Sequence, residues 1–174
     1  GDPWGGRFNG RVNLEQVVLV GHSRGGEGIE RAAIDTWPED PWQIQGLVLI
    51  GPTAFGRQMA AGIHTAVILP YCDGDVSDLQ GQQYVDIGRD LTRDRALRAS
   101  VMAMGTNHNY YNTEWTLGLS KSPAWDDWFD PGDPQCGENR ERRLSPAEQQ
   151  AVGLAYTAAL VDLAVGGNAR FLSL

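Results

Sequence analysis

Residues 14–28 read LEQVVLVGHSRGGEG, an apolar run followed by a glycine-rich turn. The run from Leu14 to Val20 is continuous and rich in β-branched residues, as in a strand covered on both faces of a parallel sheet. Beyond the turn, apolar side chains recur at helical spacing from about Gly25 to Thr36, before Pro38 breaks the pattern. These residues predict a strand, a sharp turn and a helix in direct succession.

Three further apolar segments have the composition of strands, and each ends in a turn or loop. They are IQGLVLIGP at 44–52, HTAVILPYC at 64–72 and ASVMAMG at 99–105. A helix is expected within 80–98, with Tyr84, Ile87 and Leu91 facing inward. Strands that alternate with helical segments predict a doubly wound, mostly parallel α/β sheet.

The C-terminal part divides into a long irregular segment and a helix. Residues 110–144 carry many aromatic side chains, which favours an ordered loop. A helix is predicted over 145–165, because Ser145 and Glu148 form a capping box and Pro146 fits the first turn. Its apolar face is expected to contain Val152, Ala155, Tyr156, Ala159, Leu160 and Leu163. The whole chain, 1–174, is interpreted as a single domain.

The composition argues against several classes of protein. The 174 residues carry a formal net charge of −8, which opposes binding to nucleic-acid phosphates. Arg140, Arg142 and Arg143 alternate with acidic residues and are interpreted as solvated charges. No apolar run is long enough to span a bilayer, and no signal peptide is visible. Cys72 and Cys136 lack metal-ligand spacing; they form one disulfide in an exported protein or remain two thiols otherwise.

The residues Gly21-His22-Ser23-Arg24-Gly25 match G-x-S-x-G and stand between the predicted strand and helix. In that context the motif forms a sharp turn that lifts the serine hydroxyl clear of the sheet. We expect Ser23 to be a nucleophile, with glycine required at positions 21 and 25 because side chains would collide there. The following helix start offers N–H groups to an oxyanion, and the N–H of Arg24 is the expected donor. A glycine-rich turn without catalysis is the alternative.

A serine hydroxyl needs a base, and the chain contains three histidines. His22 adjoins the serine, where its ring is not expected to reach the hydroxyl in line. His64 begins a predicted strand, at the opposite end of the sheet from the motif. His108 follows the last strand, at the carboxyl edge where open α/β sheets bind ligands. His108 is therefore the expected base, with a structural loop histidine as the alternative.

The acid of a Ser-Asp-His order must lie between Ser23 and His108. The turn after the third strand, DGDVSD, offers Asp73, Asp75 and Asp78 at the same edge of the sheet. Asp75 has the usual separation from the strand end and is the expected acid, with Asp73 next. Its role would be to orient the imidazole and to stabilise its cationic form. The remaining carboxylates fit ordinary turn residues.

A further signal lies in three segments, GHSRGGEG, PYCDGDVSDLQG and GTNHNYYNTEW. Together they resemble a group of bacterial α/β-hydrolases, many of them exported and many from actinobacteria, and the similarity runs from Asn13 to about Leu174. The resemblance implies an esterase, lipase or related acyl hydrolase that needs no metal and no cofactor. It carries the triad over to Ser23, Asp75 and His108. It also implies a secreted protein, with a cytoplasmic one as the alternative.

The chain departs from that group on its N-terminal side. The group has several strands before the nucleophile strand, and residues 1–13 contain none. The chain begins with Gly1 rather than Met, so it is interpreted as the C-terminal portion of a longer domain. The expected consequences are an open apolar sheet edge and the absence of the loop that supplies a second oxyanion donor.

The resulting hypothesis is hydrolysis of a small-molecule or polymeric carboxylic ester through an acyl-enzyme on Ser23. A peptidase or acyltransferase would use the same triad, and a non-catalytic member would bind a ligand in the cleft. Arg24 and Glu27 flank the serine, either as a helix-surface ion pair or as a site for a substrate carboxylate. The aromatic residues of 110–144 either contact substrate or fill space under the loop. The sequence sets no acyl group, alcohol or oligomeric state.

Overall fold

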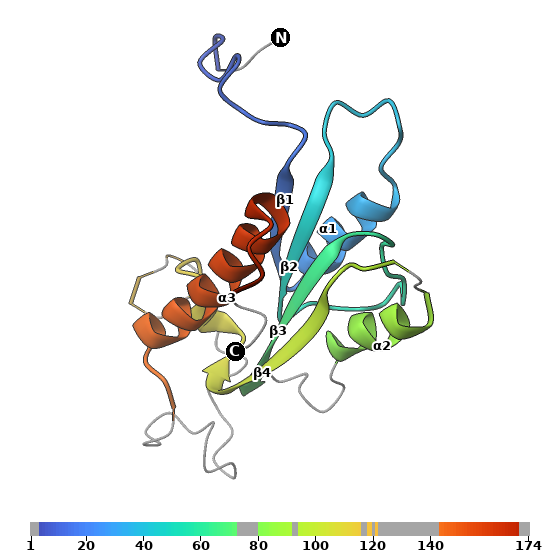
Figure 1. The fold of residues 1–174 in the computed structure, drawn as a ribbon. Coiled ribbons are helices and arrows are strands. Elements are labelled where there is room, and N and C mark those ends of the chain that lie inside the picture. Colours follow the sequence, from blue (N-terminus) through green and yellow to red (C-terminus); the bar gives the residue numbers. More distant parts are fainter. Residues whose placement is uncertain are drawn as a thin grey trace.

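Figure 1 shows the computed structural model of the chain, which describes residues 4–72, 80–91, 94–115, 118–119, 121 and 143–170. Four parallel strands form one sheet in the order β1-β2-β3-β4, so each strand pairs with the next one in sequence. The strands are β1 (Val17–His22), β2 (Ile44–Ile50), β3 (His64–Cys72) and β4 (Arg98–Asn107). The helices are α1 (Arg24–Ile34), α2 (Gln82–Leu91), the 3-10 helix η2 (Asn109–Tyr111) and α3 (Pro146–Gly166).

Helices cover both faces of the sheet, because β2 is apolar on both sides. Leu47 and Leu49 are fully buried in a core shared with α1 and with Tyr84 of α2. Val48 alternates with them and lies in a second core, beside Leu160 of α3. Figure 1 shows α3 on one side of the sheet and α1 and α2 on the other. The predicted α/β arrangement, a parallel sheet with helices on both faces, is confirmed at this level.

The predicted strands are present, with boundaries shifted by a few residues. β1 begins at Val17 rather than Leu14, because the Asn13 carboxamide accepts the N–H of Glu15 and holds this segment in a turn. The same strand continues to His22, so the G-x-S-x-G motif begins inside it. The serine therefore follows the last residue of β1 directly.

The three α-helices lie where the sequence predicts them. On α2, Tyr84 is buried and Ile87 packs against the same core, while the side chain of Leu91 lies outside the described part of the structure. α3 begins with the predicted capping box. The hydroxyl of Ser145 accepts the N–H of Glu148 at 3.4 Å, and the Glu148 carboxylate accepts the N–H of Ser145 at 2.8 Å.

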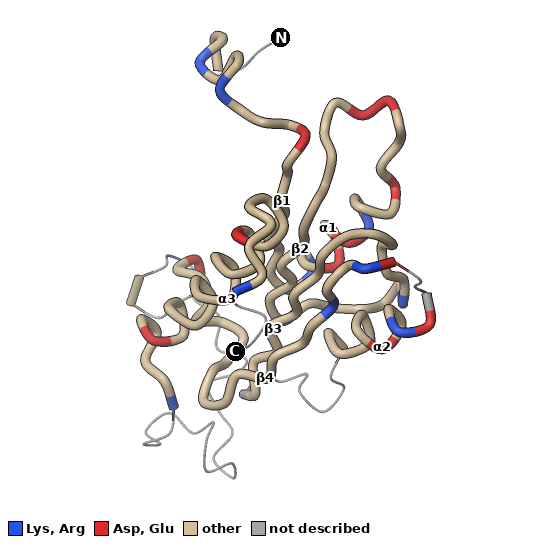
Figure 2. The backbone as a smooth tube through the Cα atoms, in the orientation of Figure 1, with Lys and Arg blue, Asp and Glu red and all other residues tan. Residues whose placement is uncertain are grey.

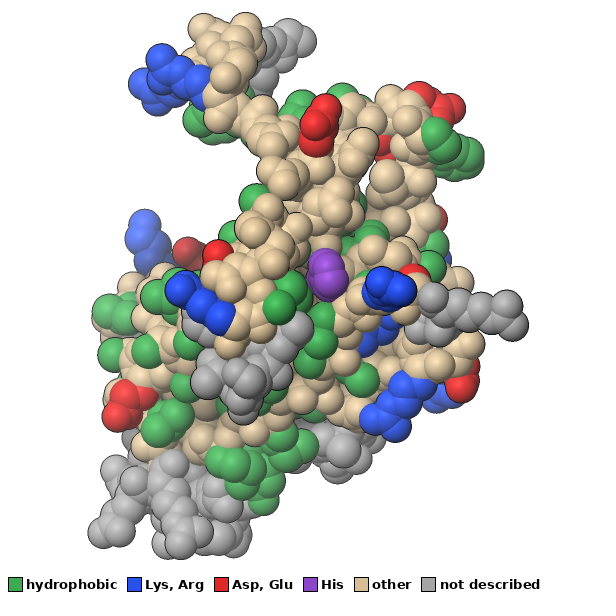
Figure 3. All heavy atoms as spheres, in the orientation of Figure 1, with side chains coloured by type: hydrophobic (Ala, Val, Ile, Leu, Met, Phe, Trp, Pro, Cys, Tyr) green, Lys and Arg blue, Asp and Glu red, His purple; other side chains and the backbone are tan. Residues whose placement is uncertain are grey.

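The apolar face predicted for α3 is wrong in part. Ala155 and Tyr156 are exposed, whereas the buried line contains Gln149 and Leu160. The outward side of α3 is also apolar: Leu154 is 69% exposed. Apolar side chains gather over α3 in the space-filling view of Figure 3. A helix with so few polar residues has no periodicity that marks its inner side. Packing against the sheet therefore determines which side of α3 faces inward.

Charged residues lie mostly in the loops and on the helices (Figure 2). Arg143 was expected to be solvated, and this is wrong: it is half-buried, with its guanidinium carbon 5.5 Å from the centroid of the Tyr110 ring. A cation over an aromatic face accounts for that position. Arg140 and Arg142 lie outside the described residues. Among the helices that are described, none has the length and apolar character needed to cross a bilayer.

Candidate active site

A turn of one residue joins the sheet to the first helix. β1 ends at His22 and α1 begins at Arg24, so Ser23 alone makes the change of direction. Its backbone has φ 58° and ψ −128°, a conformation that is unfavourable for a non-glycine residue and that recurs at functional sites. The Ser23 N–H donates to the carbonyl of Ile50 at 2.9 Å, and its own carbonyl accepts the N–H of Gly26 at 2.9 Å. Both β2 and α1 therefore hold the turn in place.

Crowding at this turn explains two glycines, one of which the sequence analysis did not identify. A Cβ on Gly21 would overlap the backbone of Gly25, as expected. A Cβ on Gly25 would meet nothing within 4 Å, so the prediction of a collision at this position is wrong. The second crowded position is Gly26, where a Cβ would lie 2.8 Å from the Cβ of Pro52. Gly25 supplies the backbone that Gly21 approaches, and α1 packs closely on the loop after β2 through Gly26.

Thr53 is the centre of a hydrogen-bond network behind the turn. Its N–H donates to the Ser23 carbonyl at 3.4 Å, and its hydroxyl donates to Oε2 of Glu27 at 2.6 Å. Its carbonyl accepts the hydroxyl of Tyr84 at 2.6 Å. The loop after β2 is thus joined to α1, to α2 and to the nucleophile position.

This network assigns Glu27 a role that neither sequence interpretation contained. No ion pair joins Arg24 to Glu27 in the part of the chain that is described; Glu27 accepts hydrogen bonds from Thr53 and from the N–H of Gly56, the latter at 2.8 Å. Burial raises the pKa of the Glu27 carboxyl, but the hydrogen bonds outweigh it and leave the pKa below its ordinary value. Glu27 is therefore an ionised anchor for the loop after β2.

His108 follows the last residue of β4, and that strand end is fixed by buried amides. Asn107 is fully buried; its N–H donates to Oε1 of Gln149 at 2.9 Å, and its Oδ1 accepts the N–H of Tyr110 at 3.2 Å. Gln149 lies on α3, is also fully buried and donates to the carbonyl of Leu144 at 2.8 Å. Gln149 could not be recognised from the sequence, because a glutamine near a helix start carries no local signal of burial.

Three rings meet at the carboxyl edge of the sheet. The ring centroids of His22 and His108 are 4.6 Å apart, with a 36° angle between the planes. The Trp115 ring lies 4.9 Å from that of His22 and 5.7 Å from that of His108, and it is within 11° of parallel to the latter. Nδ2 of Asn112 lies 2.7 Å from Nδ1 of His22. The expected base therefore packs against the residue that precedes Ser23, with one aromatic residue of 110–144 beside it.

The expected triad is brought together only in part. Ser23 and His108 lie at the same edge, but within the described residues no hydrogen bond joins the serine hydroxyl to the imidazole. Such bonds are often long or poorly aligned before substrate binds. The expected acids and the two cysteine side chains lie outside what the structure describes: Asp73, Asp75, Asp78, Cys72 and Cys136.

The start of α1 follows Ser23 directly. Arg24 is exposed and is the first residue of the helix, whose N–H groups and dipole make the region favourable for negative charge. The N–H of Gly26 is already bonded to the Ser23 carbonyl. Arg24 lies directly after Ser23, and its role as an oxyanion donor stays a prediction.

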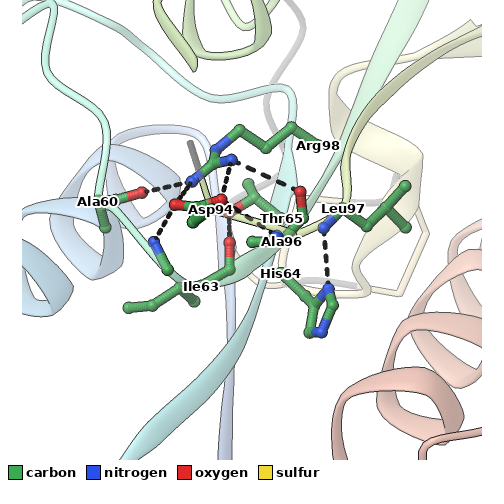
Figure 4. A network of polar contacts seen from close by, with 9 residues as sticks. Ala60, Ile63, His64, Thr65, Asp94, Ala96, Leu97 and Arg98 are labelled. Carbon is green, nitrogen blue, oxygen red and sulfur yellow. Dashed lines mark hydrogen bonds and ion pairs between the residues drawn. The ribbon is translucent and has the colours of Figure 1, made fainter. Parts of the chain in front are cut away.

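His64 lies at the opposite end of the sheet, as expected, and belongs to a structural network. It begins β3, and its Nδ1 accepts the N–H of Leu97 at 2.9 Å. Beside it, Asp94 accepts two hydrogen bonds from the Arg98 guanidinium, each 2.9 Å long, and one from the N–H of Gly62 at 2.6 Å. Figure 4 shows how these groups join the starts of β3 and β4 to the preceding loops.

Comparisons with known proteins add no assignment. No family model, no curated protein and no solved structure matches the chain. The described residues contain no group of three or more His, Cys, Asp or Glu side chains placed to hold a metal ion. Among the described residues, the strained turn at Ser23 and the packing of His108 against His22 are the features that bear on function.

Proposed function

We propose that this protein is a serine hydrolase of the α/β-hydrolase type that cleaves carboxylic esters. The observation that carries the proposal is the backbone of Ser23, a non-glycine residue at positive φ, alone between a parallel strand and a helix. A strained turn of this kind exposes a nucleophile at the edge of a sheet. Glycine would adopt the same conformation at lower cost, so a purely structural turn gives no reason for a serine there.

In the proposed mechanism, Oγ of Ser23 attacks the ester carbonyl carbon while His108 accepts the hydroxyl proton. The carbonyl oxygen becomes an oxyanion, which the N–H of Arg24 and the start of α1 stabilise. His108 returns the proton to the leaving alkoxide, and the acyl group remains on Ser23. Water then attacks the acyl-enzyme with His108 as base, which releases the carboxylic acid and restores the serine hydroxyl.

Asp75 is the proposed acid, with Asp73 as the nearest alternative. The pairing of β3 with β4 supports an acid from this segment, because Cys72 is the register partner of Asn107. The segment DGDVSD follows Cys72 directly, as His108 follows Asn107. Acid and base would therefore leave neighbouring strands at the same level of the sheet, the geometry that orients an imidazole by a carboxylate.

The proposal includes further strands beside β1, as in the group that the chain resembles. β1 is at an edge of the described sheet, and its Val20 side chain is 51% exposed. A strand paired there would cover this apolar surface. The same group implies that a loop from the added strands supplies a second oxyanion donor, whose loss typically lowers the rate about 100-fold or more. Export, an ester substrate and independence of cofactors and metals complete the proposal.

A fluorophosphonate, which reacts with activated serines, tests the proposal. We expect a single adduct that mass spectrometry maps to Ser23 and that is absent in Ser23→Ala. His108→Ala should slow labelling about 100-fold or more, because the hydroxyl loses its base. Ser100→Ala is the matched control: it makes the same change on β4, where the Ser100 hydroxyl donates to Gln82, and should leave labelling unchanged.

The labelling experiment also separates the alternatives. Labelling only in a form extended by strands beside β1 would mean that those strands complete the oxyanion site. No adduct on Ser23 in either form, with both folded, would contradict the hydrolase and leave a ligand-binding module. If Ser23 is labelled, activity on peptide bonds would identify a peptidase in place of the ester hydrolase. Acyl transfer to an alcohol in place of water would identify an acyltransferase.

A further inference from the structure

The side-chain amide of Asn112 has one orientation that satisfies both Trp115 and His22. Its Oδ1 accepts the N–H of Trp115 at 3.1 Å, which an amide nitrogen in that position could not do. Its Nδ2 therefore faces Nδ1 of His22, 2.7 Å away. Because an amide nitrogen only donates, Nδ1 of His22 must accept and carries no proton. A neutral His22 then has its proton on Nε2.

Asn112 contacts His22 and Trp115, the two residues of the described part of the chain whose rings lie against that of His108. Through Nδ2 it sets the imidazole of His22, whose centroid is 4.6 Å from that of His108. Through Oδ1 it holds the backbone of Trp115, whose ring stacks on His108 at 5.7 Å. The imidazole of His108 is therefore confined by two neighbours that share one anchor.

The charge of His22 matters because His108 becomes a cation in the proposed reaction. A neutral His22 does not repel that cation, whereas a protonated His22 would put two positive charges on adjacent rings. Protonation would also add a hydrogen at Nδ1, facing the amide hydrogens of Asn112, and would break their hydrogen bond. Asn112 thus opposes the charged form of His22.

We propose that His22 is a positioning residue, held by Asn112 as the neutral Nε2–H tautomer, which sets the ring of His108 beside Ser23. The positioning role rests on the proposed hydrolase function, whereas the tautomer of His22 does not. The two parts are therefore tested by different measurements.

¹⁵N NMR of the histidine-labelled chain tests the tautomer. We expect a bonded proton at Nε2 of His22 and none at Nδ1. In Asn112→Asp, Nδ1 should become protonated, because a carboxylate only accepts. Asn13→Asp is the matched control, since Asn13, before the start of β1, also accepts a backbone N–H at Oδ1 and donates from Nδ2 to a side chain. A protonated Nδ1 of His22 in the unchanged chain would overturn the inference, even if Asn112→Asp did not fold.

A double-mutant cycle tests the positioning role through the rate of fluorophosphonate labelling at Ser23. Asn112→Asp should slow labelling about tenfold or more, and Asn13→Asp should not. His22→Phe keeps a ring against His108 but cannot be charged. In the His22→Phe background, Asn112→Asp should slow labelling of Ser23 by less than about threefold. An equal cost in both backgrounds would mean that Asn112 acts only through Trp115, and no cost in either would also overturn the proposal.

Failure of the hydrolase proposal gives a different result. Ser23 would then stay unlabelled in every folded variant and in the extended form, while the NMR spectrum still reports the tautomer of His22. Labelling of Ser23 at the same rate in Asn112→Asp and in the unchanged chain would instead leave the hydrolase intact and remove the role of His22.

Discussion

The strained backbone of Ser23 depends both on hydrogen bonds and on a neighbouring residue that has no side chain. Its positive φ is offset by hydrogen bonds to Ile50 and Gly26, on two different elements. Those elements approach closely only because Gly26 has no side chain facing Pro52. The turn at Ser23 therefore depends on the close packing of α1 against the loop after β2.

Replacing Gly25 and Gly26 by alanine, one at a time, separates the effect of steric crowding from that of helix propensity. Gly26→Ala should lower the free energy of unfolding by about 1–3 kcal/mol, because its Cβ would lie 2.8 Å from that of Pro52. Gly25→Ala should be neutral, or stabilise by up to about 1 kcal/mol, because its Cβ meets nothing and alanine favours the helix. Urea unfolding measures both. Similar losses in the two variants would contradict the assignment.

Among the elements, α1 holds the loop after β2 with two glutamates. Glu27 is ionised and bonded to Thr53, whereas Glu30 is only 2% exposed and accepts the N–H of Ala60. Its second oxygen, Oε2, is buried without a hydrogen-bond partner among the described residues. Burial raises the pKa of Glu30, against the opposing effects of the Ala60 hydrogen bond and the charge of Arg98. One helix thus holds the same loop with two carboxyls whose pKa values are shifted in opposite directions.

The raised pKa of Glu30 predicts the direction of a pH effect on stability. A group whose pKa is higher in the fold contributes its full stability below its ordinary pKa, about 4.3 for Glu, and loses it as the pH rises through the folded value. Glu30→Gln keeps the shape and stays neutral. Relative to the unchanged protein, it should become more stable in urea unfolding as the pH rises above about 4 and through the raised folded pKa. A difference that does not vary with pH would contradict this account.

The candidate site and a supporting hydrogen-bond network lie at opposite ends of the sheet. Ser23 and His108 lie at the carboxyl ends of β1 and β4. The amino ends of β3 and β4 are joined by Asp94 and Arg98, and the Arg98 side chain is only 7% exposed. Arg98 also donates to the carbonyl of Ala60 at 3.3 Å, which ties the strand to the loop before β3.

Asp94→Asn tests this separation. The Arg98 guanidinium, with the N–H groups of Gly62 and Ala96, holds the pKa of Asp94 well below its ordinary range. A lowered pKa contributes stability above the ordinary value of about 3.9, and this is lost as the pH falls toward the folded value. The variant should therefore be less stable than the unchanged protein at about pH 7, and the difference should shrink below about pH 4.

The same variant has a second readout at the other end of the sheet. The rate of fluorophosphonate labelling at Ser23 should be unchanged at neutral pH, because the Asp94 network lies at the amino ends of the strands. Urea unfolding at both pH values and a labelling time course provide the measurements. Slow labelling of a folded Asp94→Asn protein would show that the two ends are coupled.

Local patterns in the sequence determined the class of fold and the order of its elements. The apolar runs marked all four strands, since a continuous apolar run bounded by turn residues can be recognised from the sequence alone. The Ser145–Glu148 capping box marked the start of α3 for the same reason. His64 and His108 could be assigned to opposite ends of the sheet because parallel strands share one direction. The choice of Asp75 as acid stays a prediction.

Only the tertiary structure determined which residues are in contact at the candidate site. The contacts of His22 with Asn112 and with His108 join segments far apart in the chain, and no spacing in the sequence encodes them. The crowding at Gly26 depends on where the loop after β2 lies, and the inner side of α3 depends on the sheet beneath it. Periodicity and motifs describe neighbours along one element. Contacts between elements are set by how their surfaces pack, and this is a property of the whole fold.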